Sequence, residues 1–193
     1  MSRRTIAIAA ALSVLALGSP FGTASANPLA IQYFNQGVEK YETGNYQGAI
    51  ADYTKVIEIS PQSAVAYYNR GLAKDDSGDY EGAIADYNKA IEINPQYAIA
   101  YGNRGNSKNR LGDLQGAIAD YTKAIEINPE YANAFANRGA AKYELGDHKG
   151  AIADCNKALE INPKDADTYY NRGNAKSELK DYQGAIADYN KAI

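Results

Sequence analysis

The stretch from Ala64 to Tyr97 reads AVAYYNRGLAKDDSGDYEGAIADYNKAIEINPQY, and its pattern recurs along most of the chain. The clearest marker of the period is a proline that returns every 34 residues, at Pro61, Pro95, Pro129 and Pro163. A single compact core requires no such period, whereas an array of equivalent structural units does. The sequence therefore predicts a repeat protein.

Within one unit, the spacing predicts two antiparallel helices. The first helix carries small and apolar residues at helical intervals and stops at Gly78, a residue type that closes helices. Asp79 can cap the second helix, whose apolar stripe recurs at three and four residues until Pro95 ends it. Where two helices cross closely, bulk is excluded. The expected small crossing residues are Gly71, Ala83 and Ala90, with the rings of Tyr67 and Tyr87 beside them.

These positions match a known repeat. Tyr67, Gly71, Ala83, Tyr87, Ala90 and Pro95 stand where the tetratricopeptide repeat (TPR) has its aromatic, Gly, Ala, aromatic, Ala and Pro. The unit closely resembles a TPR, which implies an all-α fold, a right-handed α-solenoid of stacked antiparallel helix hairpins. Five repeats are expected, at 30–63, 64–97, 98–131, 132–165 and 166–193, in one TPR domain spanning 27–193.

The two end repeats depart from the pattern. In the first, Gln36 replaces the arginine seen at Arg70, as expected for a terminal unit whose packing differs. The fifth stops inside its second helix, without the closing proline or the extra solvating helix that commonly caps TPR arrays. Either the apolar residues of its last face meet water, or a second molecule covers them, or the natural chain is longer. A homo-oligomer through the C-terminal end is one possible consequence.

Residues 1–26 are a different kind of sequence. Arg3 and Arg4 precede a 12-residue apolar run from Ile6 to Leu17, and small residues follow up to Ala26. This layout is typical of a cleavable secretory signal, with cleavage after Ala26. The run is shorter than the roughly 20 apolar residues of a membrane span, which favours cleavage over an anchor. We expect an exported protein, periplasmic, secreted or in a thylakoid-type lumen, with no stable membrane insertion after cleavage; the twin arginine and general export routes both stay open.

The net charge of the chain argues against one class of partner. The chain has 20 basic and 23 acidic residues, for a formal charge of −3. Removal of the signal takes away two arginines, leaving 18 basic residues against 23 acidic ones, a charge of −5. An acidic surface is unsuited to a phosphate backbone, so we expect no nucleic-acid partner.

The sequence contains no catalytic motif that we recognise. It has no Gly-rich phosphate loop, no HExxH and no serine nucleophile elbow, and a single histidine excludes most acid–base arrangements built on two. His148 and Cys155 are the only histidine and cysteine, and one of each cannot complete a four-ligand zinc site. We therefore expect a non-catalytic protein with no cofactor and no metal.

Charged residues also recur with the repeat. One aspartate stands three residues before one lysine in each second helix, which we interpret as surface pairing worth a few tenths of a kcal/mol. On this interpretation, Asp120→Asn should cost less than Ala117→Leu at a helix crossing. Four arginines in the first helices either reach these aspartates or lie along the helix with their heads in water. The pairs are Asp52 and Lys55, Asp86 and Lys89, Asp120 and Lys123, Asp154 and Lys157, Asp188 and Lys191; the arginines are Arg70, Arg104, Arg138 and Arg172.

The resemblance implies a binding groove lined by the first helices. An asparagine recurs once per repeat in that row, and because its amide both donates and accepts, a ladder of them can hold an extended peptide by its backbone. The other interpretation is that the amides bridge neighbouring first helices. The cations with which some TPR domains clamp a C-terminal carboxylate are missing, so no such clamp is expected. Candidate groove residues are Tyr68, Asn69, Asn103, Asn106, Asn137, Tyr170, Asn171 and Asn174.

Together, these features predict an exported, non-catalytic interaction module that binds a protein or extended peptide in the groove of a TPR solenoid. Two alternatives stay open on the sequence alone. The chain could be a structural scaffold that self-assembles through its uncapped C-terminal repeat. It could also be an accessory subunit of an enzyme complex whose chemistry lies in another chain.

Overall fold

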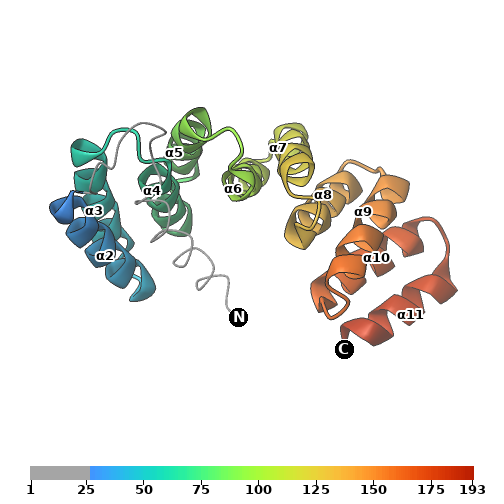
Figure 1. The fold of residues 1–193 in the computed structure, drawn as a ribbon. Helices are drawn as coiled ribbons and strands as arrows, with labels where there is room; N and C mark the ends of the chain where they lie inside the picture. The colour runs from blue at the N-terminus through green and yellow to red at the C-terminus, as the bar shows by residue number, and fades with distance from the viewer. Residues whose placement is uncertain (1–26) are drawn as a thin grey trace. The chain divides into compact units, whose positions relative to one another are not determined.

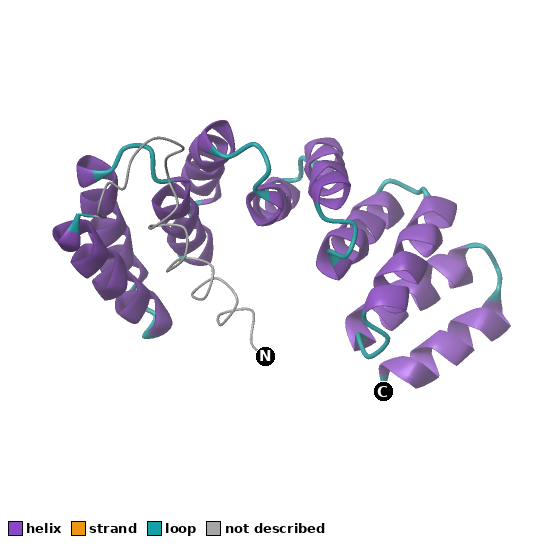
Figure 2. Ribbon diagram, viewed as in Figure 1, coloured by secondary structure: helices purple, strands orange, loops and turns teal. Residues whose placement is uncertain are grey.

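Helices make up the regular structure of residues 27–193, the part of the chain that the computed structural model describes (Figure 2). They follow one another as hairpins, each with a first and a second helix joined by a short turn (Figure 1). The all-α, stacked-hairpin class predicted from the sequence is confirmed. The predicted export signal, residues 1–26, lies outside the described residues.

The described chain forms two compact units that meet in sequence between Gln96 and Tyr97, one residue before the predicted start of the third repeat. The first unit contains two hairpins and the second contains three. The first unit holds α2 (Pro28–Glu42), α3 (Tyr46–Ile59), α4 (Ala64–Asp76) and α5 (Tyr80–Ile93). The second holds α6 (Ala98–Arg110), α7 (Leu114–Ile127), α8 (Ala132–Glu144), α9 (His148–Ile161), α10 (Ala166–Glu178) and α11 (Tyr182–Ala192).

The turn inside each hairpin follows from local chemistry. After α4, Gly78 takes a φ of 89°, in the left-handed region that favours glycine. Asp79 then caps α5, since its Oδ1 accepts from the Gly82 N–H at 2.9 Å. A Cβ at Gly82 would lie 2.1 Å from Asp79 Oδ2, so any larger residue there would displace the cap. Equivalent caps stand at Asn45, Asp113, Asp147 and Asp181.

A glycine on the first helix of a hairpin lies against the second helix. A Cβ added at Gly71 of α4 would lie 2.9 Å from the ring of Tyr87 on α5, so the tyrosine fills the space that a side chain would need. Ala83 and Ala90 of α5 are fully buried, and the Ala83 carbonyl oxygen would lie 3.2 Å from the same added Cβ. The predicted small crossing residues are therefore found at the crossing.

The repeated aspartates are buried ion-pair centres. Asp120 is 4% exposed, and its carboxylate accepts from Arg104 Nε at 2.8 Å and Nη2 at 2.5 Å, while Lys108 Nζ lies 2.8 Å away. The aspartate faces the first helix, where arginine and lysine stand one turn apart. The same set recurs at Asp86, Asp154 and Asp188 with Arg70 and Lys74, Arg138 and Lys142, and Arg172 and Lys176.

The pairing predicted between each aspartate and the lysine three residues later is therefore wrong. Four of these lysines pair instead with a glutamate one turn further on in the same helix; Lys123 Nζ, for example, lies 2.9 Å from Glu126 Oε2. Lys191 lies over the ring of Tyr169. Burial disfavours ionisation of the Asp188 carboxyl, but hydrogen bonds from Arg172 and Lys176 outweigh it and hold its pKa below the ordinary value. The aspartates are thus charged partners inside the fold, and the expectation that Asp120→Asn is mild loses its basis.

The arginines also join successive hairpins. Arg70 Nη1 donates to Thr54 Oγ1 on α3 at 3.1 Å, and Arg138 Nη1 donates to Thr122 Oγ1 on α7 at 3.0 Å. Of the two interpretations of these arginines, the structure supports reach across the hairpin. In the first hairpin, Gln36 takes the arginine position, and Lys40 Nζ lies 2.6 Å from Asp52 Oδ2.

Candidate partner-binding surface

The first helices of the second unit, α6, α8 and α10, each carry an asparagine at the same repeat position. Asn103, Asn137 and Asn171 are all partly exposed. α8 contacts both α6 and α10, so the three helices form one row. We call Asn103, Asn137 and Asn171 the asparagine row. It presents neutral groups that both donate and accept hydrogen bonds.

Asn106 on α6 is the centre of a hydrogen-bond network. Its Oδ1 accepts from the Tyr121 hydroxyl on α7 at 2.9 Å and from Asn137 Nδ2 on α8 at 2.8 Å. Its own Nδ2 donates to Asn103 Oδ1 over a longer 3.4 Å. Both lone pairs of the Asn106 amide oxygen thus serve protein groups. Asn106 and Asn137 therefore join three helices, which is the bridging role left open by the sequence.

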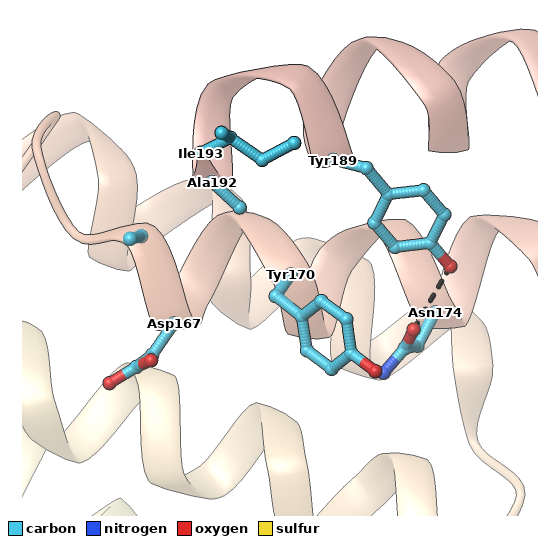
Figure 3. A pocket seen from close by; sticks show the side chains of 7 residues that line it. Asp167, Tyr170, Asn174, Tyr189, Ala192 and Ile193 are labelled. Carbon is cyan, nitrogen blue, oxygen red and sulfur yellow. Dashed lines mark hydrogen bonds between the residues drawn. The ribbon is translucent and has the colours of Figure 1, made fainter.

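The last hairpin repeats half of this arrangement. The Tyr189 hydroxyl on α11 donates to Asn174 Oδ1 on α10 at 2.9 Å (Figure 3). The ring of Tyr170 lies 5.7 Å from that of Tyr189, tilted against it, and Tyr170 is 55% exposed. Both rings, with Ala192 and Ile193, border a hollow of about 440 Å³. Tyr170 and Asn174 therefore lie together at an open apolar edge.

The two candidate residues of the first unit are placed differently. Tyr68 is 3% exposed, and its ring packs 5.9 Å from that of Tyr87. Asn69 is 7% exposed, and its Nδ2 donates to the Val65 carbonyl of its own helix at 2.8 Å. Neither side chain is presented on the surface as the asparagine row is.

Sequence reasoning missed the tyrosine hydroxyls as partners of these asparagines. The signal is present: an asparagine stands 15 residues before the tyrosine in both networks, Asn106 with Tyr121 and Asn174 with Tyr189. Leu72 stands 15 residues before Tyr87, and the buried Tyr87 hydroxyl has no hydrogen-bond partner among the described residues. The presence of the pair therefore varies from repeat to repeat.

The single cysteine is chemically quiet. Cys155 is buried, and burial raises the pKa of its thiol to about 11, so almost none of it is thiolate at neutral pH. Across residues 27–193, no group of three or more His, Cys, Asp or Glu side chains is placed to hold a metal ion. Among the same residues, no helix has both the length and the apolar character needed to cross a bilayer.

Comparison with known families identifies the repeat. A family profile described as TPR repeat matches residues 37–74, 105–146 and 139–180, and profiles described as tetratricopeptide repeat match 64–97 and 86–119. The chain belongs to the tetratricopeptide repeat family. This places it among protein-interaction modules, a class whose fold is generally non-catalytic.

Solved structures agree with this fold. A crystal structure of the MamA protein is 27% identical, covers 85% of this chain and 90% of its own, and superposes with a TM-score of 0.77. MamA from Desulfovibrio magneticus RS-1, 18% identical over 86% of this chain and 94% of its own, gives 0.79. YrrB, described as a TPR protein with an unusual peptide-binding site, is 24% identical over 85% of this chain and 84% of its own, with a TM-score of 0.71. No curated protein sequence matched the chain.

Proposed function

We propose that this TPR protein is an exported interaction module that binds an extended segment of a partner protein along the asparagine row of its second unit. The observation that carries the proposal is the placement of one partly exposed asparagine on each of three adjacent first helices, at Asn103, Asn137 and Asn171. Peptide binding by a protein of the same fold, YrrB, is consistent with this use of the fold.

The chemistry of the row defines the kind of partner. An amide side chain offers a donor and an acceptor to a peptide backbone, so a row of them contacts main-chain groups whatever the side chains are. The three residues carry no charge, which favours a neutral stretch of backbone over a charged terminus. The row would therefore bind an extended segment with little demand on its sequence.

Export is the second part of the proposal. Cleavage after Ala26 would leave Asn27 as the first residue, and the described fold begins there: Asn27 Oδ1 accepts from the Leu29 N–H at 2.9 Å and caps α2. The whole of α2 would thus survive processing with its cap. Intact-mass measurement of the exported protein should give a chain starting at Asn27; Met1 retained on membrane-bound protein would contradict cleavage.

Binding is tested by selecting linear peptides from a random phage-displayed library against residues 27–193. The double variant Asn103→Ala with Asn171→Ala should weaken binding of the selected peptides about tenfold, because each amide contributes a hydrogen bond of about 0.5–1.5 kcal/mol. The helix content and melting temperature of the double variant should stay unchanged, because alanine is the better helix former. Asn190→Ala, an exposed asparagine on α11, is the matched control and should bind normally.

Two outcomes would overturn the row as the site. One is normal binding by the double variant. The other is binding that falls only in step with the melting temperature, which would make the row purely structural. Asn137→Ala is the reference for a structural role. Asn137 also donates to Asn106, so this change should lower both the peptide affinity and the melting temperature.

A further inference from the structure

The last turn of α4 carries two neighbouring carboxylates, Asp75 and Asp76, at the helix end that favours positive charge. The free carbonyl groups of a helix C-terminus give it a partial negative charge, so two acids there are electrostatically unfavourable. Lys74, the basic residue of the same turn, is directed to α5, where its Nζ lies 2.8 Å from Asp86 Oδ2. A local charge rule that is broken in this way is expected mainly at functional sites.

A buried hydroxyl without a partner lies beside this turn. Tyr87 on α5 is 0% exposed, and its hydroxyl makes no hydrogen bond within residues 27–193. In the next repeat, the equivalent hydroxyl of Tyr121 donates to Asn106 on the first helix, a position that Leu72 occupies in α4. The Tyr87 hydroxyl is therefore directed to the same side of its hairpin, where the leucine offers it no acceptor.

Two carboxylates and two further tyrosines lie around this hydroxyl. Burial raises the pKa of Tyr87 well above its ordinary value, and nearby ionisable groups, Asp75 and Asp76 among them, raise it further. Tyr41 on α2 donates a hydrogen bond to Asp76 Oδ2, and the ring of Tyr68 packs 5.9 Å from that of Tyr87. We call Tyr41, Tyr68, Asp75, Asp76 and Tyr87 the acid–tyrosine cluster. All five residues lie within the first unit.

The cluster offers the groups that hold an organic cation. Carboxylates accept charge-assisted hydrogen bonds, and the faces of aromatic rings attract cations. Calcium takes roughly six to eight oxygen ligands, whereas the part of the chain that the structure describes contains no group of three or more His, Cys, Asp or Glu side chains placed to hold a metal ion. An ammonium group has three N–H donors and needs fewer partners. The cluster therefore fits an ammonium group better than a metal ion.

We propose that the acid–tyrosine cluster is a binding site for a primary ammonium group, which donates to the Asp76 carboxylate and to the Tyr87 hydroxyl. Asp76 is exposed, so solvent reaches it, while Tyr68 and Tyr87 close the inner side. Tyr41 uses one carboxylate oxygen, Oδ2, and a carboxylate accepts hydrogen bonds at both of its oxygens. The bound ammonium would supply the positive charge that favours this helix end and the partner that the buried hydroxyl lacks within residues 27–193.

The ammonium group has two possible sources, a lysine side chain of a partner protein or a free aliphatic amine. Both present the same chemistry to the cluster. The site does not depend on peptide binding at the asparagine row, because the row lies in the second unit.

The equivalent turns of the second unit lack this combination. In α6 the positions of the two aspartates hold Asn109 and Arg110. In α8 the exposed Glu144 stands at the position of Asp76, but Cys155 replaces the tyrosine of the second helix, so no hydroxyl is present there. Glu144 is therefore a matched control: an acid at the same repeat position without the rest of the cluster.

The test uses two capped tripeptides, one with lysine between two glycines and one with norleucine, which ends in a methyl group, in its place. Each is titrated into the protein of residues 27–193 and followed by the ring signals of the tyrosines in carbon–proton spectra. The signals of Tyr41 and Tyr68 should shift with the lysine peptide, which should bind at least about tenfold more tightly than the norleucine peptide. The ring signals of Tyr182, exposed on α11, should stay in place.

A third probe, butane-1,4-diamine, distinguishes the two sources. Tighter binding of the diamine than of the lysine peptide would assign the site to a free amine, and the reverse order would assign it to a partner's lysine. Calcium chloride in place of the amine should leave the ring signals of Tyr41 and Tyr68 unmoved.

Variants locate the binding. Asp76→Asn should weaken the lysine peptide about tenfold and Tyr87→Phe about threefold, while Glu144→Gln should bind normally. The melting temperature of Tyr87→Phe should not fall, so its loss of affinity is separate from unfolding. Equal binding of the two peptides, normal binding by Asp76→Asn, or ring signals that move with calcium chloride would each overturn the proposal. Failure here leaves the asparagine row untouched, since its test uses different residues and a different probe.

Discussion

Hairpins α4–α5 and α6–α7 are consecutive copies of one repeat, yet they use the same asparagine position differently. In α4, Asn69 is buried and its amide donates to the Val65 carbonyl of its own helix. In α6, Asn103 is partly exposed and accepts from Asn106, which also joins α7 and α8. The shared position thus bonds to the backbone of its own helix in the first case and to the asparagine that joins three helices in the second.

The difference follows from one neighbouring position. Asn106 stands where the previous repeat has Leu72, and only the asparagine can accept from the tyrosine on the second helix. The Tyr121 hydroxyl therefore has a partner, whereas the Tyr87 hydroxyl is buried without one among residues 27–193. Burial accordingly raises the pKa of Tyr87 well above its ordinary value. A residue that recurs in every repeat is thus weak evidence that its role recurs.

The largest expected loss of stability comes from the buried aspartate that both hairpins contain. Asp86→Asn and Asp120→Asn should each lower the free energy of unfolding by about 2–4 kcal/mol, because each leaves an arginine and a lysine without their buried carboxylate. Urea denaturation measures this, with Glu92→Gln and Glu126→Gln as controls for exposed pairs worth less than about 0.5 kcal/mol. Equal losses in the aspartate and glutamate variants would contradict the buried ion-pair account.

A smaller effect on stability is expected from the tyrosine hydroxyl, which the two hairpins use differently. Tyr121→Phe removes a hydroxyl that donates to Asn106 and should lower the free energy of unfolding by about 1 kcal/mol. Tyr87→Phe removes a buried hydroxyl that has no hydrogen-bond partner in the described part of the chain and should be neutral or stabilising. Denaturation of the matched pair decides this, and a loss of similar size in both would show that the Asn106 network adds nothing.

The smallest effect tests the asparagines themselves. Asn69→Ala should change the free energy of unfolding by less than about 0.5 kcal/mol, because the gain in helix propensity offsets the loss of a bond within one turn. Asn137→Ala should cost more, since it breaks a bond between helices. Thermal melts followed by circular dichroism compare the two. If Asn69→Ala proved the more damaging, burial at that position would matter more than the hydrogen bonds.

The hairpins were predictable because their signals act over a few residues. Gly78 ends α4 and Asp79 caps α5 through bonds confined to the turn, and the recurring proline marks the end of the first four second helices. The small residue at the crossing is as easily predicted, because only a residue without a side chain leaves room for the Tyr87 ring at Gly71. Contacts of this kind can be predicted from the sequence without knowing how the helices pack.

The partners of the charged and polar side chains were not predictable in the same way. Asp86 and Arg70 lie on different helices, and their contact depends on how these helices rotate about their axes as they pack. The nearer lysine, Lys89, was the obvious partner in sequence and the wrong one, because Asp86 faces inward. The burial of Tyr68 beside Tyr87 was missed for the same reason, since spacing within one helix does not show what covers it.

The central claim is that the asparagine row binds an extended partner segment. The most direct measurement is a nitrogen–proton correlation spectrum of the side-chain amides, recorded while a peptide selected from the linear library is titrated into residues 27–193. The account predicts that the amide signals of Asn103, Asn137 and Asn171 shift with the binding curve, whereas that of the exposed Asn190 on α11 stays in place. Shifts confined to residues outside α6, α8 and α10, with the three amide signals unmoved, would contradict it.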